Sequence, residues 1–127
     1  MFGNGTYLPV VVSIDYDPAA DDDIPIWRAP FDCVVRSAYA TVANAVAADG
    51  ANYFDLALYN GGTLGTALTA LGGTIGGTAG WTALLPKAFS VSAGALTAGQ
   101  LVKLRYNEAG TGTFAQMIVQ LDVQAGI

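Results

Sequence analysis

The stretch NYFDLALYNGG, residues 52–62, shows most directly how this chain folds. Phe54, Leu56 and Leu58 alternate with other residues, and the run ends in Asn-Gly-Gly at residues 60–62. Apolar residues at every second position are typical of a strand that buries one face, and an Asn-Gly pair marks a turn. The stretch therefore predicts one strand followed by a turn.

The other face of this strand raises the question of what covers it. It carries Tyr53 and Tyr59 and a single charge, at Asp55. Charged residues make up 12% of the chain and hydrophobic residues 53%, whereas a usual charged share is about 25%. A face so poor in charge is expected to pack against another molecule, or to lie beneath the glycine-rich segment 61–80 of the same chain.

The same alternation recurs along the chain at spacings of roughly 8 to 15 residues, and helical periodicity is nearly absent. The expected strands are 10–17, 24–30, 31–47, 52–60, 64–71, 81–91, 100–108 and 114–124. About eight short strands separated by turn signals predict an all-β fold, an antiparallel β-sandwich of jelly-roll-like type. Alternation does not determine strand order, so an immunoglobulin-like sandwich and a small barrel stay open as alternatives.

The length of 127 residues predicts one domain. We expect residues 1–9 to be an N-terminal arm and residues 10–127 to be a single β-sandwich domain. Residues 18–23 (PAADDD) are expected to form an acidic loop, and residues 109–113 (AGTGT) a hairpin connection between the last two strands. Alternation places Val10, Val12, Ile14 and Tyr16 on one face of their strand, and Phe54, Leu56 and Leu58 on the apolar face of theirs. The side chains expected to point inward from the last two strands are Val102, Leu104, Tyr106, Met117, Val119, Leu121 and Val123.

The charged and sulfur-containing residues exclude several classes of function. The net charge is −5 with only five lysines and arginines, and nucleic-acid binding needs basic residues against phosphate, so we expect no direct nucleic-acid partner. Cys33 is the single cysteine, which precludes an intrachain disulfide, and we interpret it as a small buried residue. We also expect no signal peptide and no membrane span, because no apolar run reaches roughly 18 residues.

Residues suited to catalysis or metal binding are scarce. Histidine is absent, which removes the usual general base and the commonest zinc ligand. The aspartates at 21–23 are interpreted as a solvated loop, since their spacing does not match a dedicated calcium loop. The carboxylates that a glycosidase pair would need lie in no recognisable motif and are expected to be solvated: Asp15, Asp32, Asp55, Glu108 and Asp122. We therefore expect no enzymatic activity, no cofactor and no metal site.

Four longer stretches of the sequence carry a resemblance to a known class of proteins. They are IPIWRAPFDCVVRSAYA (24–40), NYFDLALYNGGTLGT (52–66), GALTAGQLVKLRYNEAGTGT (94–113) and MIVQLDVQ (117–124). Together they resemble small β-sandwich virion proteins of tailed bacteriophages, of the head decoration or cement type. The resemblance implies a structural protein that forms a homotrimer, assembles in the host cytoplasm, and binds the major capsid protein or other virion proteins on the capsid surface.

For such a role we expect partner contacts from exposed aromatic, apolar and basic side chains. The residues expected to make these contacts are Phe2, Tyr7, Trp27, Arg28, Tyr53, Tyr59, Leu101 and Ile118. The alternative function is a host-recognition or carbohydrate-binding module of a fibre or tail, in which Trp27 or Trp81 would stack on sugar rings. The competing interpretation of these two tryptophans is that each closes an end of the core or lies at a subunit contact.

Overall fold

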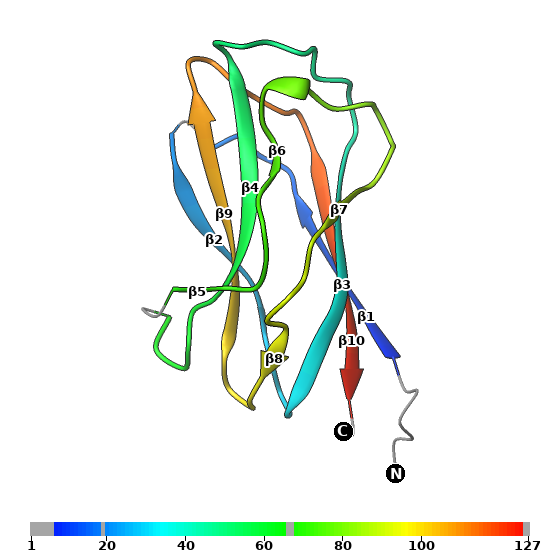
Figure 1. Cartoon of the computed structure of the whole chain (residues 1–127), viewed down its shortest axis with the longest axis vertical. Coiled ribbons are helices and arrows are strands. Elements are labelled where there is room, and N and C mark those ends of the chain that lie inside the picture. The colour runs from blue at the N-terminus through cyan, green and yellow to red at the C-terminus, as the bar shows by residue number, and fades with distance from the viewer. Residues whose placement is uncertain (1–6, 19, 66–67, 126–127) are drawn as a thin grey trace.

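Two antiparallel sheets face each other in the computed structural model, which describes residues 7–18, 20–65 and 68–125 (Figure 1). Sheet A contains β1 (Tyr7–Ile14), β3 (Cys33–Val42), β7 (Lys87–Phe89), β8 (Ala95–Leu96) and β10 (Met117–Ala125). Sheet B contains β2 (Asp22–Arg28), β4 (Tyr53–Asn60), β5 (Thr69–Ala70), β6 (Ile75–Gly76) and β9 (Leu101–Ala109). A single turn of 3-10 helix, η1 (Gly77–Ala79), completes the elements of these residues.

The strands pair in a nested order. β1 pairs with β10, β2 with β9, β3 with β7 and β8, and β4 with β5 and β6. Because β10 also pairs with β3, and β9 with β4, the sheets have the orders β1-β10-β3-β7 and β2-β9-β4-β5. A long folded hairpin whose successive strand pairs alternate between two sheets is the jelly roll. The predicted antiparallel sandwich of jelly-roll type is therefore confirmed, and the strand order that alternation left open is decided.

The first strand begins earlier than predicted. Residues 7–9, assigned to the arm, belong to β1 and pair with Gln124, Val123 and Asp122. Alternation is hard to recognise there because Pro9 interrupts the apolar pattern. The strand also ends at Ile14, so the prediction that Tyr16 continues the face of Val10, Val12 and Ile14 is wrong, and this side chain is exposed. The rest of the predicted arm, residues 1–6, lies outside the described residues.

The segment 109–113 is not a hairpin connection. It leaves β9 in sheet B and leads to β10 in sheet A, so it crosses from one layer of the sandwich to the other. Glycines and threonines signal a reversal of the chain. They do not signal which sheet the next strand joins, because that depends on pairing with β1 and β3, which are far away in sequence.

The middle of the chain has less regular pairing than predicted. The strands expected at 64–71 and 81–91 are reduced to the short strands β5 and β7, while β6 and β8 lie in segments expected to be loops. The predicted acidic loop is shorter too, because Asp22 and Asp23 belong to β2. Glycine and threonine runs provide little alternation, so strand ends there are set by tertiary pairing rather than by local pattern.

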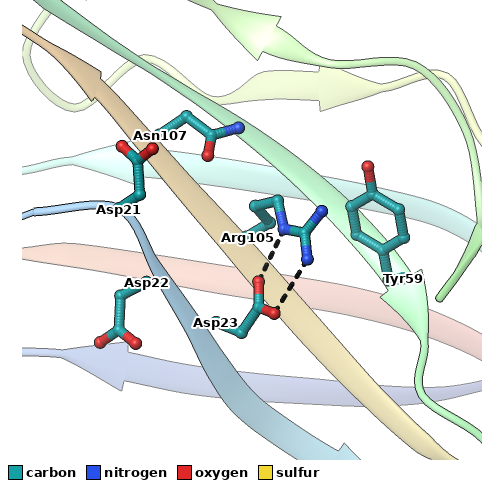
Figure 2. A pocket seen from close by; sticks show the side chains of 6 residues that line it. All are labelled: Asp21, Asp22, Asp23, Tyr59, Arg105 and Asn107. Carbon is teal, nitrogen blue, oxygen red and sulfur yellow. Dashed lines mark hydrogen bonds and ion pairs between the residues drawn. The ribbon is translucent and has the colours of Figure 1, made fainter. Parts of the chain in front are cut away.

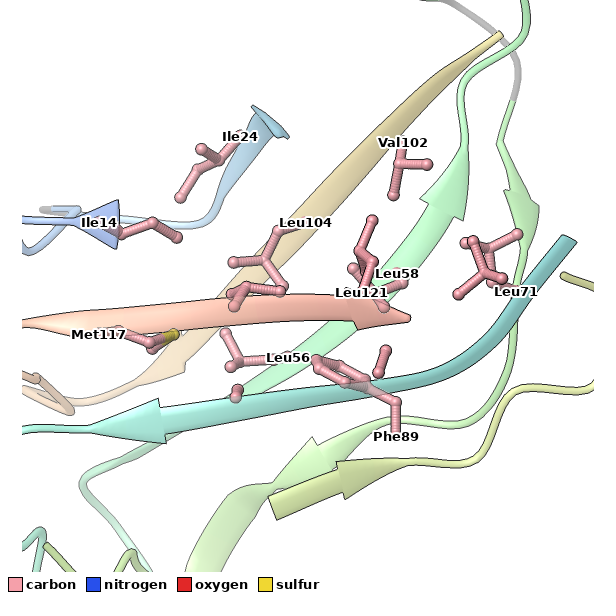
Figure 3. Close-up of a cluster of buried hydrophobic side chains, with 14 of the residues drawn as sticks. Ile14, Ile24, Leu56, Leu58, Leu71, Phe89, Val102, Leu104, Met117 and Leu121 are labelled. Carbon is pink, nitrogen blue, oxygen red and sulfur yellow. The ribbon is translucent and has the colours of Figure 1, made fainter. Parts of the chain in front are cut away.

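The core lies between the two sheets and is built from the inward faces that alternation predicts (Figure 3). From β9 and β10 come fully buried side chains, namely Val102, Leu104, Tyr106, Met117, Val119, Leu121 and Val123. From β4 come Phe54, Leu56 and Leu58. These predicted inward positions are confirmed. Cys33 is also buried, as predicted, and burial together with the Asp32 carboxylate raises the pKa of its thiol.

Aromatic rings close one end of this core. The ring centroid of Phe54 lies 5.4 Å from those of Trp81, Tyr106 and Phe114. Trp81 is only 4% exposed, so its interpretation as a residue that closes the core is confirmed and it offers no open platform for a sugar. Trp27 is half-buried and packs against the core cluster.

Tyr106 combines a buried ring with a satisfied hydroxyl group. The hydroxyl donates to the carbonyl oxygen of Gly112 at 2.8 Å, with the Glu108 carboxylate at 3.0 Å and the Asp17 carboxylate at 3.4 Å. Burial is the main cause that raises the pKa of this phenol well above its usual range, and the two carboxylates add to it. The hydroxyl therefore ties the crossover segment to β9 as a neutral donor.

Replacing Tyr106 by phenylalanine should lower the free energy of unfolding at pH 7 by about 1–3 kcal/mol, because the Gly112 carbonyl loses its buried donor. The raised pKa adds a pH dependence: the phenol stabilises the folded state below pH 10 and this contribution falls as the pH rises further. Urea titrations at pH 7 and pH 11 would measure both effects. Tyr16→Phe, at an exposed position, is the matched control; equal losses in the two variants would contradict the role of the buried hydroxyl.

Candidate interaction surfaces

A polar groove of about 580 Å³ lies on the outer face of sheet B (Figure 2). It is lined by Asp21, Asp22, Asp23, Tyr59, Arg105 and Asn107. These residues come from three neighbouring strands or their ends: β2, β4 and β9. The register of the sheet explains why they meet. Arg105 lies opposite Asp23 on β2 and opposite Ala57 on β4, two residues before Tyr59. Directly opposed residues in a sheet point to the same face, as do residues two positions apart on one strand.

Arg105 contacts the side chains on both sides of it in this groove. Its guanidinium makes a two-pronged contact with Asp23, with Nε–Oδ1 at 2.8 Å and Nη2–Oδ2 at 3.0 Å. It also lies 4.7 Å from the ring centroid of Tyr59, close enough for a cation–π interaction. The hydrogen bond from Arg105 is the main reason why the pKa of Asp23 lies below its usual value.

The position of Arg105 answers part of the question raised by the tyrosines of β4. Tyr59 is half-buried because a side chain of the adjacent strand β9 lies over its ring. The glycine-rich segment instead supplies β5 and β6, which pair with β4 and extend sheet B. The segment 61–80 therefore does not cover Tyr59, whereas packing of this face against another molecule stays a prediction. The contact with Arg105 depends on a cross-strand register that alternation alone does not reveal.

Two of the three aspartates that line the groove have partners within the chain. Asp21 accepts a hydrogen bond from the backbone N–H of Glu108 at 2.9 Å, and Asp23 is paired with Arg105. Among the described residues no group of three or more His, Cys, Asp and Glu side chains is arranged to hold a metal ion. The groove is thus a polar, acidic surface, because its three carboxylates exceed its one guanidinium group.

The ion pair of Asp23 and Arg105 should make a small, pH-dependent contribution to stability. Asp23→Asn is expected to lower the unfolding free energy at pH 7 by about 0.2–1 kcal/mol, the range for exposed pairs. Because the folded-state pKa of Asp23 is lowered, this difference is present above the unfolded pKa near 4 and disappears as the pH falls through the lower folded value. Thermal unfolding from pH 7 to pH 2 would test it; a difference that persists at pH 2 would assign the loss to another cause. Asp22→Asn, at an exposed neighbouring position, is the control.

The outer face of sheet A has a different character, with few charges and several apolar side chains. Val11 on β1 is 58% exposed, and Ile118 on β10 is also exposed. The Asp122 carboxylate on this face accepts hydrogen bonds from Ser37 at 2.7 Å and from Gln120 at 2.9 Å. The carboxylate is therefore hydrogen-bonded by neighbouring side chains of the same sheet. The face exposes mainly apolar and neutral groups to solvent.

An apolar cleft of about 210 Å³ borders this face. It is lined by Thr41, Val42, Ala43, Leu84, Gln116, Met117 and Ile118. Leu84 is 75% exposed and has a backbone φ of 61°, a left-handed conformation that is unfavourable for a leucine and is often found at functional sites. The next residue, Leu85, is 58% exposed. The loop thus presents two adjacent leucines to solvent.

The eight residues predicted to contact partners fall on different parts of the molecule. Tyr7 and Ile118 are exposed on sheet A, and Arg28 is exposed at the end of β2. The side chains of Trp27, Tyr53, Tyr59 and Leu101 on sheet B are half-buried. Phe2 lies outside the described residues. The structure therefore does not gather these residues into one site, and their role as contacts stays a prediction.

Several exposed apolar residues were not among those predicted. They are Leu8, Val11, Leu64, Leu68, Leu84 and Leu85. Leu84 and Leu85 occur in a segment with strand-like composition, and the structure places them in a loop between the Val46–Trp81 bridge and β7. The proline at position 86 was the available signal that the strand could not be continuous there.

Comparison of the chain with models of protein families, with curated proteins and with solved structures finds no match in any of the three. The resemblance to phage virion proteins therefore stays a prediction. Within the described residues the only helix is the three-residue turn η1, far shorter than a membrane-spanning helix.

Proposed function

We propose that this chain is a structural protein of a tailed-phage virion, of the decoration or cement type, which binds the head and stabilises it without catalysing a reaction. The observation that carries the proposal is the apolar character of its surface. Nine large hydrophobic side chains are exposed among the described residues, namely Tyr7, Leu8, Val11, Tyr16, Leu64, Leu68, Leu84, Leu85 and Ile118. Five of them are grouped, three on β1 and two at the adjacent positions 84 and 85, and grouped exposed apolar side chains favour protein–protein association.

The fold is compatible with this role. A jelly roll offers two broad sheet faces and two ends formed by loops, and viral capsid proteins are among the proteins that use it. Fold alone does not imply function, so the argument rests on the surface. The two faces differ, since sheet B carries the acidic polar groove and sheet A the apolar cleft. In our proposal the chain forms a homotrimer and its apolar surfaces contact the major capsid protein or other virion proteins.

The energetic basis of this function is repeated burial of small apolar areas. Each Å² of apolar surface removed from water contributes about 25 cal/mol, less the cost of ordering side chains and subunits. A trimer that contacts the shell through three equivalent surfaces gains further, because the second and third contacts form at a high effective concentration. Many copies would thereby hold neighbouring capsomers together against the pressure of packaged DNA.

The test is electron cryomicroscopy of particles produced from the genome that encodes this chain, with its reading frame intact or deleted. We expect three-fold clusters of jelly-roll density on the outside of the intact head, and loss of this density after deletion. Particles that lack the chain should release DNA at a lower temperature, and adding the purified protein should restore the release temperature. Heads that are identical in density and in heat stability with and without the chain would contradict the proposal.

A further inference from the structure

One edge of sheet A is open for further strand pairing. Within the described residues β1 pairs only with β10, and the pairing runs without a bulge from Tyr7 opposite Gln124 to Ile14 opposite Met117. The eight residues of β1, YLPVVVSI, include no charged side chain. A long, regular, uncharged edge strand presents unpaired backbone groups that can pair with another strand.

The other sheet edges carry features that oppose such pairing. In sheet B the edge strand β2 contains Asp22, Asp23 and Arg28, as well as a register shift between Pro25 and Trp27. The remaining edges are formed by β5, β6, β7 and β8, which are only two or three residues long. Charges, bulges and short strands are the usual protection against edge-to-edge association. In β1 only Pro9 provides such protection.

The side chains of β1 are also incompletely covered. Leu8 lies on the face that points inward with Val10, Val12 and Ile14, yet it is 41% exposed. On the outward face Tyr7 and Val11 are more than half exposed. Three of the nine exposed large hydrophobic residues therefore belong to this single strand. An additional strand beside β1 would cover part of each face.

We propose that two copies of this chain pair edge to edge through antiparallel β1 strands, so that sheet A continues across a two-fold axis. Pairing about an axis perpendicular to the sheet keeps inward-facing residues opposite inward-facing ones. Outward positions then meet outward positions. Depending on the register, Val11 lies opposite Val11, Pro9 or Ser13 of the second copy. The interface is isologous, because the same strand serves both copies.

Charge favours a second copy as the occupant of this edge. The chain has a net charge of −5, so most surfaces of two copies repel each other. β1 is neutral, and with Val11 opposite Val11 the first acidic position after the strand, Asp15, lies opposite the uncharged Tyr7 of the second copy. Antiparallel pairing thus brings no carboxylates of the two copies face to face along the strand.

This contact does not depend on the proposed function. If the chain forms trimers on a head, a two-fold contact through β1 would join copies that belong to neighbouring trimers, and so would add to the three-fold contact. The contact can be detected with the purified protein alone. A failure to pair through β1 is therefore distinct from a failure to bind heads.

Cysteine cross-linking tests the geometry directly. Pro9→Cys, Val11→Cys and Ser13→Cys place a thiol at exposed outward positions of β1, and opposed residues in an antiparallel pair lie within the Cα distance that a disulfide requires. Under mild oxidation we expect a covalent dimer from at least one variant or from a mixture of two variants. Ser92→Cys is the control, because Ser92 is also exposed but lies outside β1, between β7 and β8. Cross-linking by none of the β1 variants, or equally by Ser92→Cys, would overturn the proposal.

A charge substitution tests the energetics. Val11→Lys places two ammonium groups near each other across the axis and should weaken self-association at least tenfold in sedimentation equilibrium, while far-ultraviolet circular dichroism stays unchanged. Ser92→Lys adds the same charge at an exposed position outside β1 and should leave association unaltered. Wild-type protein that stays monomeric at millimolar concentration, or equal effects of the two lysines, would refute β1 pairing.

Discussion

Replacing Phe54 by alanine should lower the free energy of unfolding by about 3–5 kcal/mol, the range for removal of a large buried aromatic side chain. Phe54 is 1% exposed and its ring lies 5.4 Å from three other aromatic rings, those of Trp81, Tyr106 and Phe114. The substitution removes the ring on which the other three pack. Because they come from separate segments of the chain, no single backbone movement can fill the cavity.

A loss of this size is a large part of the roughly 5–15 kcal/mol by which domains are usually stable. Urea titration followed by tryptophan fluorescence would measure it, since Trp81 contacts Phe54 and reports on the same region. Leu64→Ala is the control: Leu64 is 85% exposed, so its removal should change stability by less than about 0.5 kcal/mol. A small loss for Phe54→Ala would mean that the aromatic cluster does not form the end of the core.

Gly72→Ala should destabilise the protein by about 3 kcal/mol or more, for a steric reason. Gly72 forms an isolated bridge with Val91, and a Cβ atom at this position would overlap the carbonyl oxygen of Ser90. The obstacle is backbone, so no side-chain rotation can relieve it. The flanking hydrogen bonds from Gly73 N–H to Ser90 O at 3.2 Å and from Ser92 N–H to Leu71 O at 2.8 Å would be strained or broken.

The adjacent residue provides a matched control for this prediction. A Cβ atom at Gly73 would meet nothing within 4 Å, and Gly73 has no positive φ. Gly73→Ala should therefore be neutral or slightly stabilising, because alanine restricts the unfolded chain more than glycine does. Thermal and urea unfolding of both variants would compare them. Similar stabilities for the two variants would show that the close approach of residues 72 and 90 is not required.

Neither the polar groove nor the apolar cleft could be predicted from the sequence as a unit. The acidic residues at 21–23 and the tyrosine at 59 were recognisable as surface features, but their common groove was not. It forms because β2, β9 and β4 are neighbours in sheet B, which places Arg105 between Asp23 and Tyr59. The apolar cleft was also not predicted, because its residues come from β3, β10 and the loop before β7.

Alternation along the chain was enough to predict the all-β class and most inward faces, because it is a local property that burial of one strand face imposes on every second residue. The tertiary structure alone decided the nested strand order, the crossing of residues 109–113 between sheets, the cover over Tyr59 and the open edge at β1. Each of these depends on contacts between distant residues, such as Arg105 with Asp23, 82 positions apart. A local pattern shows which face of a strand is buried, but it carries no information about which strand lies beside it.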